Sequence, residues 1–405
     1  MKLALIIDNY LPHSTLSSAK MFHELAVELE NQGRRVVVIT PQPKQATKLV
    51  KDKIDGIEIW RFRSGEIRGV GKIKRAINES LLPINAWSSI QEKVKVDGFD
   101  GFDGVIYYSP SIFFGYLVRK IKQYCKCPAY LILRDFFPQW AVDLGLISRG
   151  SLIERYFRFF ERYLYKQAEV IGVMSQKNLN LFNESTRGAY KTQILRNWAN
   201  VIPHTVSSNS ESFRKRLGLT GKTIFFYGGN IGHAQDMANL MRLAKGMRKY
   251  SQAHFLFVGQ GDEVKLIKQL AGKWSLKNFS YLPSISQEAF KNLLKEVDVG
   301  LFSLSANHTS HNFPGKLLGY MVENLPILGS VNRGNDLLDT INSYDAGLIF
   351  VNGEDEQLLD AAKRLLHEDG LRAKISDGAT KLLHEQFSVR SAAYLITNSL
   401  SAFWC

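Results

Sequence analysis

Short apolar, β-branched runs alternate with helix-length amphipathic segments along most of this chain. Residues Ser18 to Gln32 show the helical type, because their apolar side chains recur every three to four positions and Gly33 follows as a stop signal. Strands that alternate with helices form parallel sheets covered by helices on both faces. We therefore predict doubly wound α/β domains, with strands in the first half at Lys2–Asp8, Arg35–Thr40, Ile57–Phe62, Gly104–Ser109, Ala129–Asp135, Val170–Ser175 and Thr192–Asn197.

The alternation breaks once, near the middle of the chain. Asn200–Ser212 contains Pro203 and a cluster of Ser and Asn residues, a composition typical of a hinge. Since 405 residues exceed the roughly 250–300 that one core holds, we expect two Rossmann-like domains, residues 1–199 and 200–385, facing across a cleft. The C-terminal helix, about residues 386–405, is expected to pack back on the first domain. Strands of the second domain are predicted at Thr223–Gly228, His254–Gly259, Phe279–Pro283, Val297–Ser303, Pro326–Ser330 and Ala346–Val351.

Composition excludes several classes of protein. Apolar residues make up 45% of the chain and charged residues 22%, which is typical of a globular protein. The cysteines Cys125, Cys127 and Cys405 form no disulfide framework, which favours a reducing compartment. The apolar start Met1–Ile7 runs directly into Asp8, too early for a signal peptide, and no run approaches the roughly 18 apolar residues of a membrane span. We expect a cytoplasmic protein.

The positive charge of the chain is unevenly distributed. The net charge is +14, with 30 basic and 19 acidic side chains in residues 1–200 and 22 basic and 19 acidic side chains in the remainder. A basic half attracts an anionic partner. Nucleic acid, an anionic membrane face and a phosphorylated substrate all remain candidates at this point.

Glycine-rich sequences follow two predicted strands of the second domain, at the strand ends where doubly wound sheets bind ligands. The sequence YGGNIG (Tyr227–Gly232) leads to a helix expected near Asp236, and VGQGD (Val258–Asp262) follows the next strand. Glycines let backbone N–H groups approach an anion, and a helix N-terminus adds partial positive charge that suits phosphate. A plain tight turn is the alternative. The candidate phosphate-binding residues are Gly228, Gly229, Asn230, Gln235, Gly259 and Gly261.

A lysine opens another predicted helix of the second domain. Pro314, Gly315 and Lys316 precede the apolar helix that runs through Met321. A lysine in a first helical turn opposes the helix dipole unless an anion binds there. We therefore expect Lys316 to neutralise a diphosphate and to stabilise charge on a leaving group, with His311 beside it as a hydrogen-bond donor.

Polar residues also follow two strands of the first domain. Arg134 and Asp135 leave a predicted strand, and we expect Asp135 to orient or deprotonate a hydroxyl group while Arg134 pairs with it or with phosphate. The alternative is a buried Arg–Asp pair that only holds the loop. Around the first helix start, Ser17, Ser18 and Lys20 offer hydroxyl groups and a cation, although Ser18 also suits a helix N-cap.

Two segments suggest contact with a membrane. Arg61–Leu82 interleaves basic and aliphatic residues, as in an amphipathic surface helix, and we expect it to contact anionic lipid. Its candidate membrane-contact residues are Arg68, Lys72, Lys74 and Arg75. Arg149–Lys166 mixes arginines with aromatic residues, and for it a core helix whose arginines reach outward is an equal alternative.

Several catalytic signatures are missing from the sequence. No Walker loop, GxSxG elbow, HExxH helix or zinc-knuckle spacing occurs, and no convincing Asp-x-Asp pair follows a strand. We expect chemistry without a metal or another cofactor.

Five segments together resemble the retaining glycosyltransferases of family four, and more narrowly the bacterial O-antigen and capsule enzymes of the L-fucosamine transferase type. They are the opening Asp8–Glu24, LRDFFPQWAVDLGLI (Leu133–Ile147), LRNWAN (Leu195–Asn200), YGGNIGHAQDMANL (Tyr227–Leu240) and FPGKLLGYM (Phe313–Met321). The resemblance covers the whole length and implies the GT-B fold, with a UDP-sugar donor on the second domain, a lipid-linked acceptor on the first, and retention of the anomeric configuration.

The sequence departs from the family pattern at two places. Many relatives carry two glutamates separated by seven residues, where this chain has His311 and Gly319. The arginine and lysine pair that follows the first strand of the donor domain is also missing, with Asn230 and Gln235 near those places. We therefore expect Lys316 and the glycine-loop amides to neutralise the donor diphosphate.

The leading hypothesis is transfer of an N-acetylated amino sugar, such as N-acetyl-L-fucosamine, from a UDP donor to an undecaprenyl-diphosphate-linked saccharide. The reaction would take place at the inner face of the bacterial plasma membrane. A nucleotide-sugar epimerase with the same fold is one alternative. A basic nucleic-acid-binding module is an alternative of another class, although no helix-turn-helix, RNP or zinc motif supports it.

Overall fold

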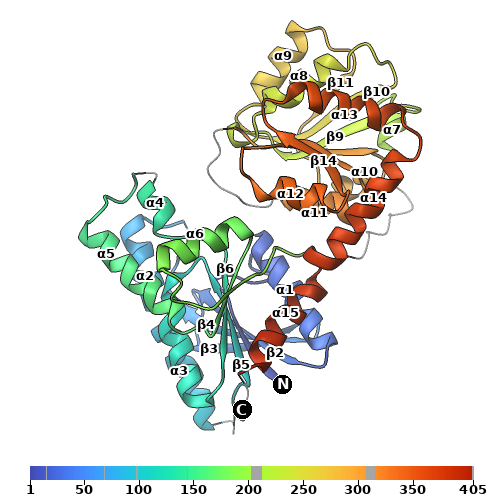
Figure 1. Cartoon of the computed structure of the whole chain (residues 1–405). Helices are drawn as coiled ribbons and strands as arrows, with labels where there is room; N and C mark the ends of the chain where they lie inside the picture. The colour runs from blue at the N-terminus through green and yellow to red at the C-terminus, as the bar shows by residue number, and fades with distance from the viewer. Residues whose placement is uncertain are drawn as a thin grey trace. The chain divides into compact units, whose positions relative to one another are not determined.

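The computed structural model describes residues 1–14, 16–67, 69–96, 99–143, 145–201, 212–306 and 315–403; the side chains of Ser17, Lys72 and residues 93–96 are not described. The chain divides into two compact units (Figure 1). The first comprises Met1–Arg196 with Val389–Cys405, and the second comprises Asn197–Ser388. Each unit is built around one sheet of its own.

The first unit has an eight-stranded sheet with the order β3-β4-β2-β1-β5-β6-β7-β8. Its strands are β1 (Lys2–Ile6), β2 (Arg35–Pro43), β3 (Leu49–Ile54), β4 (Ile57–Ser64), β5 (Gly104–Ser109), β6 (Ala129–Leu133), β7 (Val170–Val173) and β8 (Thr192–Ile194). All pair in parallel except β3, which is antiparallel to β4. The parallel strands are almost continuously apolar because helices cover the sheet.

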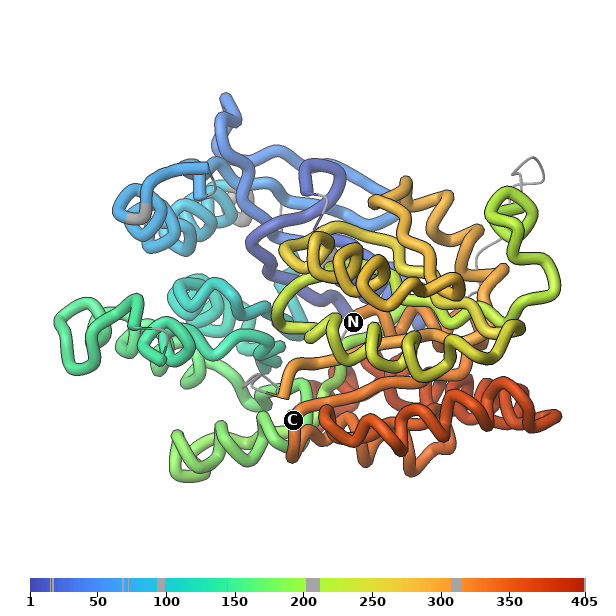
Figure 2. The backbone as a smooth tube through the Cα atoms, turned by 90° about the horizontal axis from the view of Figure 1, so that it is seen from above, coloured from blue at the N-terminus to red at the C-terminus, as the bar shows by residue number. Residues whose placement is uncertain are grey.

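Two groups of helices pack in the first unit. One contains α1 (Ser17–Asn31) and α15 (Val389–Ser401), which contact each other. The other contains α2 (Lys72–Val96), η1 (Ile112–Phe114), α3 (Gly115–Cys125) and α5 (Leu152–Tyr165), with α4 (Gln139–Asp143) and α6 (Gln176–Thr186) following β6 and β7. Because α15 packs on α1 and β6, the end of the chain returns to the unit that holds its beginning (Figures 1 and 2).

The second unit has a six-stranded sheet, all parallel, with the order β11-β10-β9-β12-β13-β14. Its strands are β9 (Thr223–Asn230), β10 (Ala253–Gln260), β11 (Phe279–Leu282), β12 (Val299–Ser303), β13 (Ile327–Val331) and β14 (Gly347–Val351). Its helices are α7 (Phe213–Arg216), η2 (His233–Gln235), α8 (Met237–Gly246), α9 (Val264–Lys273), α10 (Gln287–Leu294), α11 (Gly315–Val322), α12 (Asp336–Asn342), α13 (Asp355–His367), α14 (Leu371–Leu382) and the π-helical η3 (Leu383–Phe387).

The predicted α/β class and doubly wound sheets are confirmed, but β3 was not predicted. Its exposed centre, Lys51–Lys53, is polar and lacks the apolar character of the other strands. The turn that joins it to β4 does carry a recognisable signal, because Asp55 and Gly56 adopt φ values of 48° and 86°. Asp-Gly is the usual two-residue hairpin turn.

The predicted amphipathic helix Arg61–Leu82 was wrong in its first part. Arg61 and Arg63 belong to β4, and the helix begins only at Lys72. Arg61 is buried, where its guanidinium donates to the Asp52 carboxylate at 3.3 Å and to the Leu11 carbonyl. A buried, paired arginine holds the sheet edge and is not available to lipid. Among the helices of the described residues, none has the length and apolar character needed to cross a membrane.

The two central strands of the second unit meet backbone to backbone at their carboxyl ends. Gly229 of β9 pairs with Gly259 of β10, and a Cβ atom at Gly259 would lie 1.8 Å from the Gly229 carbonyl oxygen. Gly261 lies as close to Ile231, whose carbonyl oxygen would be 2.2 Å from an added Cβ. The close approach of these two strand ends therefore requires glycine.

We predict that Gly259→Ala destabilises the second unit by on the order of 3 kcal/mol, because the Cβ atom forces β9 and β10 apart and φ is 155° there. Urea unfolding measures the loss. Gly272→Ala in α9 is the matched control, since nothing lies within 4 Å of its added Cβ, and it is expected to be neutral or stabilising. Equal unfolding midpoints for Gly259→Ala and the wild type would contradict the prediction.

Candidate functional site

The glycines of the second-unit loops have different structural roles. Gly259 and Gly261 allow the close strand contact, and a Cβ atom at Gly228 would lie 2.6 Å from the Phe290 ring. Gly229 differs, because its φ is 117° and an added Cβ would meet only Lys316, at 3.8 Å from Cε and 3.9 Å from Nζ. Among the described residues, the Lys316 side chain alone comes within 4 Å of a Cβ atom added at Gly229.

Lys316 lies in the first turn of α11, beside the end of β9. Its Nζ is 3.7 Å from the centroid of the Tyr227 ring. Within the described ranges no carboxylate pairs with it. Burial of the ammonium group lowers the pKa of Lys316 from 10.5 to about 7. A half-buried ammonium group with an aromatic ring beside it and no carboxylate partner among the described residues is suited to receive an anion.

Tyr320 fixes α11 against the sheet. Its hydroxyl donates to the Leu301 carbonyl at 3.1 Å and accepts the Gly228 N–H at 3.3 Å. Tyr227 adds a second tie, because its hydroxyl donates to the Asn230 carbonyl. Both tyrosines therefore hold Lys316 and the β9 loop in a common position, which the sequence alone did not reveal.

The N-terminus of α8 is already occupied by a carboxylate. The helix begins at Met237, next to Asp236 as predicted, but the Met237 N–H donates to Glu263 at 2.9 Å. The same carboxylate lies 3.1 Å from His233 Nδ1. Glu263 therefore takes the place in which the sequence predicted a phosphate, and the open anion-binding position moves toward Gly229 and Lys316.

The remaining second-unit candidates lie in the same loop region or outside the described residues. Asn230 and Gln235 pair with each other, with the Asn230 amide donating to the Gln235 side-chain oxygen at 3.0 Å. Gly315 is exposed and opens α11. His311 and Pro314 lie outside the described residues.

In the first unit, charged groups gather around Tyr108 at the carboxyl ends of the strands. Burial raises the pKa of Tyr108 to about 12, with Arg134 lowering it and the carboxylates of Asp8 and Asp135 raising it. Burial also raises the pKa of Asp135 above its usual value. A carboxylate with a raised pKa at the carboxyl end of a strand is suited to accept a proton.

Arg134 has a structural role, but its partner differs from the Asp135 partner that the sequence suggested. Its guanidinium donates to the Arg196 carbonyl at 3.1 Å, which ties the end of β6 to the segment after β8. Burial lowers the pKa of Arg134 to about 10. Arg134 therefore connects two strand ends through main-chain oxygen.

Ser18 does not cap α1. The helix begins at Ser17, Leu16 occupies the N-cap position, and the Ser18 hydroxyl donates to Asn9 at 3.3 Å. Ser14 donates to the same oxygen at 3.0 Å, so Asn9 organises the loop after β1. Lys20 is exposed and lies 3.7 Å from Glu24.

A chain of hydrogen bonds that the sequence analysis missed supports this loop and runs from buried Tyr10 to exposed Asp55. Tyr10 bonds to His23 Nδ1 at 2.8 Å, and His23 Nε2 bonds to Asp55 at 2.9 Å. The three residues come from distant segments, so no local pattern could have shown their contact.

Residues 209–382 match the family of glycosyl transferases group 1. The chain is 23% identical over 333 residues to the putative colanic acid biosynthesis glycosyl transferase WcaI of Escherichia coli K12, covering 78% of this chain and 80% of the relative. The fold is also that of WaaG, a glycosyltransferase involved in lipopolysaccharide biosynthesis (TM-score 0.61, 16% identity, 98% and 99% coverage). HepE of Anabaena, solved with UDP-glucose, matches with a TM-score of 0.61 and 14% identity over all of both chains.

The chain has the GT-B fold of these glycosyltransferases. The family match lies on the second unit, which holds Lys316 and the glycine loops, and the structural likeness extends over both sheets. The GT-B fold that the sequence motifs implied is therefore confirmed, and the second unit matches the glycosyl transferases group 1 family.

Within the described part of this glycosyltransferase, no three His, Cys, Asp or Glu side chains are grouped so that they could hold a metal ion. The described residues therefore offer Lys316 as the cation nearest to the glycine loops.

The predicted membrane-contact residues are only partly described. Arg68 lies outside the described residues, and Lys72 begins α2 without a described side chain. Lys74 is exposed, whereas Arg75 pairs with Glu79 at 2.8 Å.

The lowered pKa of Lys316 predicts a pH-dependent effect of Lys316→Met on stability. Between the folded pKa of about 7 and the ordinary value of 10.5, the unfolded state binds more protons, so wild-type stability rises with pH over that window. Below the window the folded protein keeps a poorly solvated charge, which Met removes. Urea unfolding should therefore show a larger gain for Lys316→Met at acidic than at alkaline pH.

Lys245→Met provides the baseline, because Lys245 is exposed beside Trp274 in the same unit. An effect of Lys316→Met that is equal on both sides of the window would show that the ammonium is well solvated.

Proposed function

We propose that this glycosyltransferase moves a sugar from a UDP-sugar to a lipid-diphosphate-linked saccharide in the synthesis of O-antigen, capsule or exopolysaccharide. The proposed sugar is an N-acetylated amino sugar such as N-acetyl-L-fucosamine, transferred with retention. Colanic acid and lipopolysaccharide in the names of WcaI and WaaG support the polysaccharide setting, and the UDP-glucose bound to HepE supports the donor class. The choice of sugar rests on the resemblance of the sequence motifs.

The single observation that carries the proposal is the half-buried Lys316 side chain beside Gly229, with no carboxylate partner among the described residues. When the bond between the donor sugar and UDP breaks, negative charge develops on the diphosphate leaving group. A fixed cation and main-chain N–H groups at this position stabilise that charge. Donor binding then supplies the counter-ion that the free site lacks.

Asp135 is the proposed acceptor-side catalytic residue. It follows β6 in the first unit, and its raised pKa suits a group that orients the acceptor hydroxyl and takes its proton. Ser17, Ser18 and Lys20 are proposed to contact the acceptor from the start of α1. Arg134 acts by holding the β6 end in place through the Arg196 carbonyl.

The proposed location is the inner face of the bacterial plasma membrane, where a lipid-linked acceptor is reached from the cytoplasm. The excess of basic over acidic residues in residues 1–200 supports an anionic lipid environment.

A transfer assay tests the function. Purified protein is mixed with a panel of UDP-sugars, including UDP-N-acetyl-L-fucosamine and UDP-N-acetylglucosamine, and a synthetic lipid-diphosphate N-acetylglucosamine, with EDTA present throughout. A disaccharide-lipid formed from one donor identifies the sugar and shows that no free metal ion is needed. Interconversion of UDP-sugars without a transfer product would favour the epimerase alternative instead.

Replacing Lys316 by Ala should lower kcat at least about 100-fold while leaving the fold intact, because one lost electrostatic partner of a leaving group costs that much. Steady-state kinetics and urea unfolding measure the two quantities. Lys245→Ala is the control, since it removes an exposed cation that also lies beside an aromatic ring, 4.8 Å from the Trp274 centroid. Turnover of Lys316→Ala within about threefold of the wild type would refute the role.

A further inference from the structure

Large apolar side chains are exposed on the first two turns of α5. Leu152 is 81% exposed, Ile153 61% and Phe159 62%, and Tyr156 lies between them. The sequence left open whether this helix belongs to the core, and the structure shows that only its other side does, through Glu161, Leu164 and Tyr165. We call the exposed residues Leu152, Ile153, Tyr156 and Phe159 the α5 apolar face.

The neighbouring helix α2 carries a second exposed apolar set. Ile73, Ile77, Leu81 and Ile84 recur at intervals of three to four residues, so they form one stripe along the helix, and all four are exposed. The two sets are neighbours, because Ser80 of α2 hydrogen-bonds to Tyr156 of α5 at 2.6 Å. A contiguous exposed apolar surface of this kind marks an interaction site more often than chance exposure.

Unpaired cations surround the α5 apolar face. Arg149, Arg155, Arg162 and Lys166 make no ion pair in the part of the chain that the structure describes. An open hollow of about 530 Å³ runs along α5, and Arg155, Arg158, Arg162 and Lys166 line it together with Phe159 and Tyr163. The same helix face therefore offers both apolar contact and positive charge.

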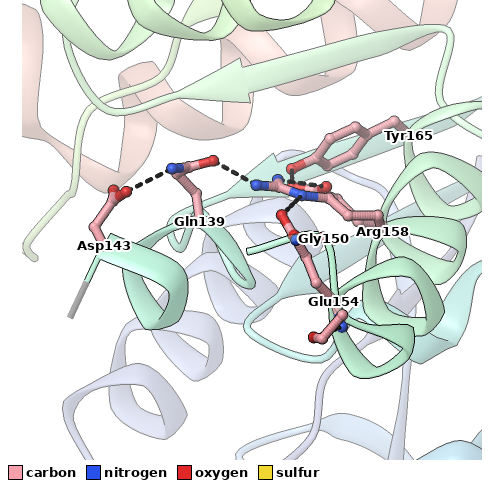
Figure 3. A network of polar contacts seen from close by, with 8 residues as sticks. Gln139, Asp143, Gly150, Glu154, Arg158 and Tyr165 are labelled. Atoms are coloured by element: carbon pink, nitrogen blue, oxygen red, sulfur yellow. Dashed lines mark hydrogen bonds and ion pairs between the residues drawn. The ribbon is translucent and has the colours of Figure 1, made fainter. Parts of the chain in front are cut away.

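Helix α5 is held firmly under this face by a polar network (Figure 3). Arg158 donates to Glu154 at 3.4 Å, to Glu161 at 3.0 Å and to the Gln139 side-chain oxygen. Glu154 also accepts the Gly150 N–H at 2.6 Å, which pins the turn before the helix. Gln139 begins α4, directly after the loop that carries Asp135, so the network links α5 to the end of this loop.

We infer that the α5 apolar face, its unpaired cations and the α2 stripe form a docking surface for an anionic lipid bilayer. The aliphatic and aromatic side chains reach the boundary of the acyl chains, and the guanidinium and ammonium groups stay at the level of the lipid phosphates. Tyrosine is well placed at such a boundary because it has an apolar ring and a polar tip. The inference gives a physical basis to the membrane location, which itself rests on the proposed function.

Charge and apolarity together favour a bilayer over the other occupants of such a surface. Nucleic acid would pair with the cations but would leave Leu152, Ile153 and Phe159 exposed to water. A second copy of this chain would bring the same cations against one another, since a twofold interface places like surfaces together. An anionic bilayer satisfies both kinds of group at once.

Co-sedimentation with vesicles tests the surface. The wild type should bind vesicles of phosphatidylcholine mixed with phosphatidylglycerol, bind phosphatidylcholine alone weakly, and lose affinity as salt rises. The charge variant Arg155→Gln/Arg162→Gln should bind the mixed vesicles about 30-fold more weakly, since each cation near an anionic surface contributes about a factor of five. The apolar variant Leu152→Ser/Phe159→Ser should lose at least about tenfold.

Matched control variants make the same changes elsewhere. Lys265→Gln/Lys295→Gln removes the same charge from exposed positions of the second unit, and Tyr394→Ser/Leu395→Ser removes exposed apolar groups from α15. Both should bind vesicles like the wild type. Equal vesicle binding by the wild type and both α5 variants would overturn the inference. A wild type that is dimeric while the apolar variant is monomeric would also overturn it, and so would wild-type protein that binds DNA more tightly than vesicles.

Transfer to a short-chain lipid-diphosphate acceptor in detergent separates this inference from the proposed function. The α5 variants should keep wild-type turnover there, because none of the four substituted residues lies in the proposed catalytic set. If the α5 variants lose vesicle binding and neither they nor the wild type transfers sugar, the docking surface is supported and the proposed function is refuted. If the wild type transfers sugar but binds no vesicles, the proposed function is supported and the docking surface is refuted.

Discussion

The backbone contact between the carboxyl ends of β9 and β10 determines how the second-unit site is built. A side chain at Gly259 would collide with the Gly229 carbonyl oxygen, so the two strands stay in register only with glycine there. This contact sets the direction of Gly229, whose free side faces Lys316. Tyr320 then fixes α11 on the same strands, and the lysine has little freedom to find another partner.

The fold was predictable from the sequence because its signals are local. Continuous apolar runs and helix-length amphipathic segments are properties of neighbouring residues. For twelve of the fourteen strands, the predicted start lies within one residue of the observed start. The strand β3 escaped because its polar face looks like a loop, although Asp55 and Gly56 mark the hairpin. Arg61 was wrongly assigned to a surface helix because a basic residue next to aliphatic ones is typical of such helices. In the structure it is a buried residue of β4 that pairs with Asp52.

The site was only partly predictable, because its decisive contacts join distant segments. Lys316 drew attention through its position at a helix start, but the Tyr227 ring beneath its ammonium group could not be deduced from spacing. Glu263 had no visible connection with α8, yet it occupies the N-terminus at which a phosphate was expected. The sequence did not distinguish the four loop glycines Gly228, Gly229, Gly259 and Gly261. The three-dimensional contacts show that three of them are needed for close packing, whereas Gly229 faces Lys316.

Lys316 differs from three other partly buried cations of the described chain, and the difference supports the functional argument. Arg214, Arg242 and Lys122 pair with Asp298, Asp355 and Glu169 at 2.5–2.6 Å, so their charges stabilise the fold. Lys316 lacks such a carboxylate, and burial lowers its pKa to about 7, so either a bound anion or loss of its proton relieves the cost of the charge. We therefore propose that the counter-ion of Lys316, beside the glycine loop, arrives with the substrate.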